Sequence, residues 1–154
     1  MINIGKRQES IDAGQSNPIV LFPEGATTNN TELIHFKRGA FFALYPVKPI
    51  TIKYSGLFFN PAHDVLNVVA HALFSACQPI TYVTVHELPV FTPNDYFFKN
   101  HVREGEEKWQ AYMRVVRELM AESLKFKLSV NKMEDKLEYK KLLYPHKEIK
   151  MKQH

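Results

Sequence analysis

The sequence has 154 residues, of which 45% are hydrophobic and 23% are charged. This composition excludes an intrinsically disordered chain and suits a single domain. Its one cysteine, Cys77, excludes an intramolecular disulfide framework and a cysteine-rich zinc module. No run of about 20 apolar residues is present, so no transmembrane helix is expected within this sequence.

The net charge of +4 is concentrated at the C-terminus, because nine lysines and four acidic residues lie in residues 125–154. A basic end can contact anionic lipid or nucleic acid, but a solvated end is the simpler interpretation. No nucleic-acid-binding motif is present, so we expect no nucleic-acid partner. We therefore predict a basic, charged tail over residues 126–154.

The first third of the chain predicts a polar helix over residues 5–16 and a buried strand over residues 18–22, where Pro-Ile-Val-Leu-Phe is a compact apolar run. A tight polar loop follows over residues 23–30. A short helix or helical turn is predicted over residues 35–44 and a strand over residues 47–54. A loop at the end of a strand is where ligands tend to bind in α/β sheets.

The rest of the chain predicts a helix capped by Asn60, with Pro61 in its first position. A strand over residues 80–91, a long helix over residues 102–124 and a charged helix over residues 133–143 complete the order. Strands and helices alternate, which favours an α/β fold with a mixed sheet flanked by helices.

Hydrophobic patterning predicts which faces are buried. In the second strand, Ile50 and Ile52 point to one side and Thr51 to the other, as in a half-buried strand. The apolar helix near Leu66–Phe74 is expected to be a core helix. One stripe of the long helix is predicted to face the core and the other to face solvent. The core stripe comprises Trp109, Tyr112, Met113, Val116, Leu119 and Met120, and the solvent face Glu106, Glu107, Arg114, Arg117 and Glu118.

The segment after the first strand contains groups that suit a polar ligand. Pro23 and Gly25 favour a sharp turn, and a glycine allows a ligand to approach the backbone closely. The Glu24 carboxylate can accept a hydrogen bond from a hydroxyl group, although it would repel a phosphate. Backbone N–H groups after Gly25, together with Thr27 and Thr28, can bind phosphate oxygens. A simple turn with a solvated glutamate is the alternative.

Three blocks stand in order along the chain: Phe-Pro-Glu-Gly at 22–25, Phe-Lys-Arg-Gly-Ala-Phe at 36–41 and Pro-Val-Lys-Pro-Ile at 46–50. Together they resemble the phospholipid/glycerol acyltransferase family, and within it the lysophosphatidylcholine and lysophosphatidylethanolamine acyltransferases. The resemblance covers about residues 18–144. It implies a glycerolipid acyltransferase-like fold whose N-terminal portion is missing, with residues 1–125 as a partial acyltransferase domain.

This resemblance implies transfer of a fatty acyl group from acyl-CoA to a lysophospholipid or glycerol-phosphate acceptor. The substrate-binding residues that it implies in the loop are Phe22, Pro23, Glu24, Gly25, Thr27 and Thr28. Lys37 is either a headgroup contact or a surface lysine. Pro46, Val47 and Pro49 would shape the wall near the acyl thioester. Acyl-CoA is a substrate, and no cofactor or metal is implied. By resemblance, the protein is expected at a membrane surface, on the cytoplasmic face of the endoplasmic reticulum.

The sequence lacks the catalytic base that the family uses. That base is the histidine of His-x-x-x-x-Asp, and none of the seven histidines has an aspartate five residues later. We therefore predict no catalytic residue in this chain, and weak or no activity for the chain alone. The alternative is a non-catalytic lipid-binding or interaction module that keeps the acceptor pocket without the base.

Overall fold

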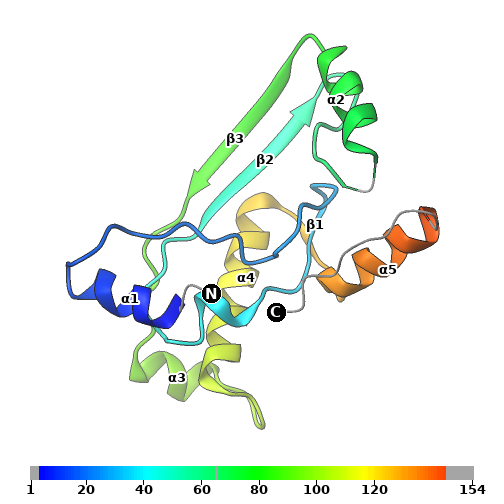
Figure 1. Cartoon of the computed structure of the whole chain (residues 1–154). Coiled ribbons are helices and arrows are strands. Elements are labelled where there is room, and N and C mark those ends of the chain that lie inside the picture. The colour runs from blue at the N-terminus through cyan, green and yellow to red at the C-terminus, as the bar shows by residue number, and fades with distance from the viewer. Residues whose placement is uncertain (1–3, 65, 145–154) are drawn as a thin grey trace.

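The computed structural model describes residues 4–64 and 66–144, and its elements mix helices with two small sheets (Figure 1). The α/β class with mixed strand pairing is confirmed: β1 and β4 pair in parallel, and β2 and β3 pair antiparallel. In chain order the elements are α1 (Ile4–Asp12), β1 (Glu32–Leu33), a 3-10 turn η1 (Arg38–Ala40), β2 (Ile50–Gly56), α2 (Val68–Ala76), β3 (Thr81–Glu87), α3 (Asp95–His101), α4 (Lys108–Leu124), β4 (Lys127–Leu128) and α5 (Met133–Leu143).

The core of the domain lies against α4. Tyr112 and Val116 are the most deeply buried residues of the predicted stripe, at 0% and 1% exposure. The Tyr112 hydroxyl donates to the carbonyl oxygens of Tyr45 at 3.0 Å and Phe91 at 3.1 Å, so a polar group in the core is satisfied. The core-facing stripe is confirmed at these positions, whereas Leu119 is 39% exposed.

Strands β2 and β3 form a long two-stranded ribbon that extends from the body and has α2 at its far end (Figure 1). The predicted orientation of β2 is wrong. Thr51 is 2% exposed, whereas Ile50 and Ile52 are 45% and 41% exposed. The reason is that the face of β2 that carries Thr51 and Lys53 packs against the rest of the domain, which includes α4. On this face the Lys53 ammonium lies 5.3 Å from the ring centre of Phe126.

The strand predicted near the N-terminus is wrong. Residues 18–22 are not a strand, and Val20 and Phe22 are 81% and 79% exposed. An apolar run becomes a strand only when another strand supplies hydrogen bonds, and no strand in the described part of the chain pairs with this one. Of the short helix or helical turn predicted over residues 35–44, the structure has the turn, η1.

The later helices begin at other residues than predicted. The α2 helix starts after Asn67, whose side chain accepts the N–H of Val69, while Asn60 caps only a local turn through Ala62 N–H. The long helix predicted over residues 102–124 starts at Lys108 and is preceded by the unpredicted α3.

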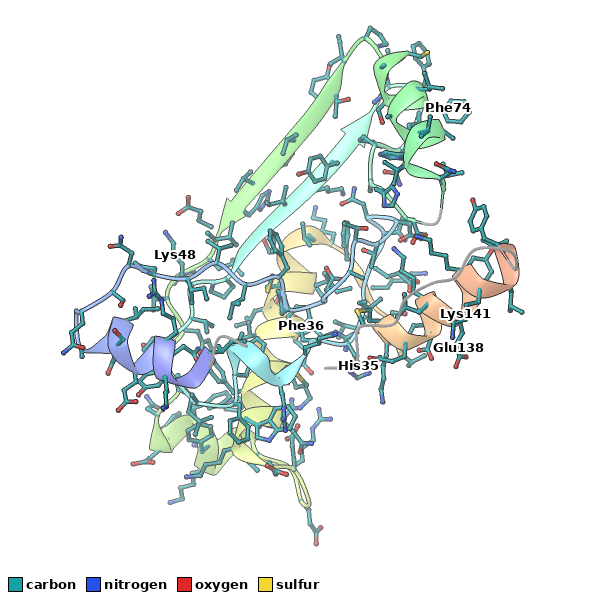
Figure 2. All side chains as sticks on the ribbon, viewed as in Figure 1. His35, Phe36, Lys48, Phe74, Glu138 and Lys141 are labelled. Carbon is teal, nitrogen blue, oxygen red and sulfur yellow. The ribbon has the colours of Figure 1, made fainter. Side chains whose placement is uncertain are left out.

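The α2 helix is also not a core helix. Its Val68, Leu73 and Phe74 side chains are between 54% and 67% exposed, and Figure 2 shows Phe74 at the far end of the ribbon. Across the described residues, no helix is both long and apolar enough to cross a membrane.

Candidate active site around the 23–28 loop

The 23–28 loop leaves the N-terminal segment through a turn centred on Gly25. The Gly25 N–H donates to the carbonyl of Phe22 at 3.1 Å, and Gly25 has a φ of +70°, in the left-handed region that favours glycine. The Lys37 N–H donates to the Pro23 carbonyl at 2.7 Å, which brings the second sequence block onto the loop. A Cβ added to Gly25 would lie 2.7 Å from Cε of Lys37. The turn therefore brings Gly25 and Lys37, two predicted site residues, into contact.

The Glu24 carboxylate turns toward β1. Its Oε2 accepts the N–H of Ile34 at 3.2 Å, so it is a half-buried group with a backbone partner and not a solvated turn residue. Burial raises the pKa of Glu24 above its ordinary value, against the lowering effects of the Ile34 hydrogen bond and of the Arg117 and Lys136 charges. The site thus holds a carboxylate that is more readily protonated than an exposed glutamate.

Arg117 of α4 is a buried cation, although helical periodicity predicted that it would lie on the solvent face. Its Nε donates to the Ile34 carbonyl at 2.9 Å, and its Nη2 donates to the carbonyls of Leu33 and Ser129. The guanidinium therefore joins the parallel β1–β4 pair to α4, beside Glu24. Helical periodicity gave no signal for this role, because a charged residue next to a core stripe ordinarily faces water.

A second cluster gathers at the Thr27 end of the loop. The Thr27 hydroxyl lies 3.5 Å from Nδ1 of His63, and the Thr27 carbonyl accepts a hydrogen bond from the ammonium of Lys136 on α5. That ammonium also pairs with Asp64 at 2.9 Å. The sequence gave no indication that His63 and Lys136, which are 36 and 109 positions after Thr27, would contact it. The Lys136 side chain is only 17% exposed, so the expectation of a solvated end is wrong at this position.

The remaining predicted residues have other surroundings. Phe22 points to solvent, and Thr28, next to Thr27 in the loop, is half-buried. Val47 pairs with Phe91 in a backbone bridge, with N–O distances of 3.0 and 2.8 Å, and Pro46 is exposed.

Pro49 lines a pocket of about 540 Å³ next to α4, away from the 23–28 loop. Its other lining residues are His86, Leu88, Pro89, Val90, Phe91, Leu119, Glu122 and Ser123, none of which belongs to the loop. Within the third block, Pro49 thus lies on a pocket apart from the loop, whereas Val47 packs on the core cluster that contains Phe36 and Phe41 of the second block.

The chemistry available at the loop is hydrogen bonding and charge. It offers a carboxylate, two threonines, the ammonium groups of Lys37 and Lys136, and the imidazole of His63. The His63 and His71 rings meet edge to face at 5.1 Å. No group of three or more His, Cys, Asp or Glu residues in the described chain is placed to hold a metal ion. The arrangement suits recognition of a polar, hydroxyl-bearing and anionic group.

Comparison with known proteins identifies the relatives of this chain. Residues 4–53 match the family model for Acyltransferase. The chain is 37% identical to lysophospholipid acyltransferase LPEAT1 of Arabidopsis thaliana over 119 residues, which is 77% of this chain and 28% of that protein. It is 31% identical to human lysophosphatidylcholine acyltransferase 2 over 134 residues, which is 83% of this chain and 22% of that protein. A lysophosphatidylcholine acyltransferase of Drosophila melanogaster is 33% identical over 108 residues, 69% of this chain and 19% of that protein.

The alignment to LPEAT1 thus takes in 77% of this chain but only 28% of the relative's length. No solved structure matches the chain. The family match begins at α1 and runs into β2, so it contains the 23–28 loop and the residues that hold Glu24 and Gly25 in place. The chain is therefore related to the acyltransferase family, and in particular to its lysophospholipid acyltransferases.

Proposed function

We propose that this chain provides the acceptor-binding part of an acyltransferase that moves a fatty acyl group from acyl-CoA to a lysophospholipid or glycerol phosphate. The observation that carries the proposal is the 23–28 loop, where a left-handed Gly25 sits under Lys37 and a half-buried Glu24 accepts the Ile34 N–H. The names of the relatives, which act on lysophospholipids, support the substrate class.

In this reaction the acceptor hydroxyl attacks the thioester carbonyl. A C–O bond forms, the C–S bond breaks, and the hydroxyl proton ends on the CoA thiol. The loop would hold the acceptor so that its hydroxyl meets the thioester, which lowers the barrier through positioning. Glu24 would accept a hydrogen bond from a glycerol hydroxyl, and the second threonine, Thr28, would contact the headgroup. Pro49 and its apolar pocket would accept part of the donor's acyl chain.

The chain lacks the His-x-x-x-x-Asp motif whose histidine would accept the hydroxyl proton, because no histidine has an aspartate five residues later. We expect the chain alone to show weak or no turnover and yet to bind the acceptor. Location at a membrane surface, on the cytoplasmic face of the endoplasmic reticulum, belongs to this proposal and follows from the substrate.

A pair of glycine variants tests the acceptor loop. Gly25 and Gly14 have nearly equal φ values, +70° and +71°, so Gly→Ala at either position costs a similar backbone strain, about 1 kcal/mol. Only at Gly25 does the added Cβ meet Lys37, whereas nothing lies within 4 Å of a Cβ at Gly14.

Binding of the soluble acceptor 1-hexanoyl-lysophosphatidylcholine can be measured by calorimetry on both variants. Gly25→Ala should weaken binding at least tenfold, and Gly14→Ala should leave it within twofold of the unaltered chain. Equal binding by all three proteins, or no binding by any of them, would contradict the acceptor site.

A second candidate function is a non-catalytic lipid-binding module, favoured by the absence of the His-x-x-x-x-Asp pair. Donor binding separates the two candidates, because both are expected to show little or no turnover by the chain alone. Binding of oleoyl-CoA together with the lysophospholipid supports the acyltransferase part. Acceptor binding without any oleoyl-CoA binding supports the module.

A further inference from the structure

The α5 helix begins beside the 23–28 loop and then extends away from the body, where Figure 2 labels Glu138 and Lys141 (Figures 1 and 2). Lys136, in its first turns, points inward. Its ammonium donates to the Thr27 carbonyl and pairs with Asp64 at 2.9 Å. An ammonium has three N–H donors, and these two contacts account for two of them. A partly buried lysine at a polar loop is placed to bind a further acceptor.

His63 stands on the other side of Thr27 with an incomplete set of partners. Its Nδ1 lies 3.5 Å from the Thr27 hydroxyl, while its Nε2 is buried and meets no hydrogen-bond partner among the described residues. The Nδ1 of His71, whose ring packs on His63, is in the same condition. A buried polar nitrogen without a partner is unfavourable, so a small movement of the ring that lets a ligand oxygen reach it would stabilise the complex.

The charges near Thr27 also favour an anion. Arg117 already gives its hydrogen bonds to three backbone carbonyls, so it acts on the loop mainly through its charge. The Lys37 side chain covers Gly25, which puts a second ammonium on the loop. Against these cations stand the Glu24 carboxylate, turned toward Ile34, and Asp64, which is the direct partner of Lys136.

We propose that Lys136 and His63 bind the phosphate of the acceptor, with the phosphate taking the place of Asp64 as partner of the Lys136 ammonium. The ligand class is a phosphate ester of glycerol, which accepts hydrogen bonds from the ammonium, the imidazole and the Thr27 hydroxyl at once. This inference rests on the proposed function. It makes α5 part of the substrate site and gives Lys136 a role in choosing phosphate-bearing acceptors over neutral ones.

The test compares two soluble ligands that share a glycerol and a hexanoyl chain and differ in the phosphate-bearing headgroup: 1-hexanoyl-lysophosphatidylcholine and 1-hexanoylglycerol. Calorimetric dissociation constants on the full chain give a preference ratio. The unaltered chain should prefer the phospholipid at least tenfold. Lys136→Met should reduce the preference about tenfold, His63→Gln should reduce it severalfold, and Lys136→Arg should keep most of it. Lys140→Met, one turn further along α5, should leave the ratio unchanged.

Each outcome has one meaning. A full preference in Lys136→Met, with binding still lost in Gly25→Ala, would overturn this inference and leave the acceptor loop standing. Binding that does not depend on Gly25 would overturn the proposed function itself. Equal affinity of the unaltered chain for inorganic phosphate and for the lysophospholipid would also overturn the inference, because the site would then recognise a free phosphate ion and not the phosphate of an acceptor. Circular dichroism shows whether Lys136→Met keeps its helices; if it does not, His63→Gln decides, and a full preference in that variant would overturn the inference.

Discussion

Replacement of Arg117 by methionine tests how the fold holds the 23–28 loop. Methionine keeps much of the side-chain volume but removes hydrogen bonds to the carbonyls of Leu33, Ile34 and Ser129. A hydrogen bond to a charged group contributes about 1.5–3 kcal/mol, and losing one partner of a buried charged network costs about 3–5 kcal/mol in total. Because Arg117 is buried, we expect a loss near the middle of that range, about 4 kcal/mol.

Urea denaturation followed by fluorescence of Trp109 measures this effect. With a slope of about 2 kcal/mol/M, a loss of about 4 kcal/mol moves the midpoint down by about 2 M, a large share of the stability of a small domain. Arg103→Met is the matched control, since Arg103 is exposed, and should change stability by less than about 0.5 kcal/mol.

A midpoint change below about 0.5 M in Arg117→Met would refute the reasoning, because the Ile34 and Ser129 carbonyls would then have found other partners, as the Leu33 carbonyl already has in the Ser129 N–H. A double-mutant cycle with Glu24→Gln adds a check. The Arg117 charge lowers the pKa of Glu24, so the two substitutions should not add.

Three further predictions follow from single side chains. Glu24→Gln should stabilise the chain at pH 7, because burial raises the pKa of Glu24 and so makes its ionised form unfavourable in the folded state. The contribution of Glu24 to stability is fully present below about pH 4.5 and is lost as pH rises through the raised pKa. In urea titrations the difference in stability between the two proteins should therefore vanish in acid and grow toward pH 7. Tyr112→Phe leaves the Tyr45 carbonyl without this donor, while the Phe91 carbonyl keeps the Val47 N–H; it should cost about 1–3 kcal/mol in thermal unfolding, and an unchanged midpoint would contradict this role. Asn67→Ala removes the α2 cap and should cost about 1 kcal/mol, seen as faster amide exchange at Val69; unchanged exchange would show that the cap is not needed.

Local chemistry in the sequence predicted several features well. The α4 stripe marked Tyr112 and Val116 as core residues, since a helical period is a property of the chain alone. The Phe-Pro-Glu-Gly block marked the turn at Gly25, because a left-handed backbone favours glycine wherever it occurs. The α5 helix was predicted over residues 133–143, and the structure has the same bounds.

Other features depended on partners that the sequence does not display. The run at 18–22 was strand-like in composition, yet Val20 is 81% exposed, because a strand needs another strand beside it. Ile50 and Ile52 face outward because α4 packs on the Thr51 side of β2. Periodicity cannot say which face of a two-stranded ribbon the body will cover.

The sequence by itself determined the bounds of α5, the core stripe of α4, the turn at Gly25 and the relation to lysophospholipid acyltransferases, since each depends on residues close together in the chain. Only the tertiary structure decided what surrounds the turn. Arg117 and Lys136 lie in charged stretches that local patterning assigns to solvent, and folding carried them to Glu24 and Thr27. A charged side chain is buried only where carbonyls and counter-ions from distant segments can satisfy it, and that supply exists only in three dimensions.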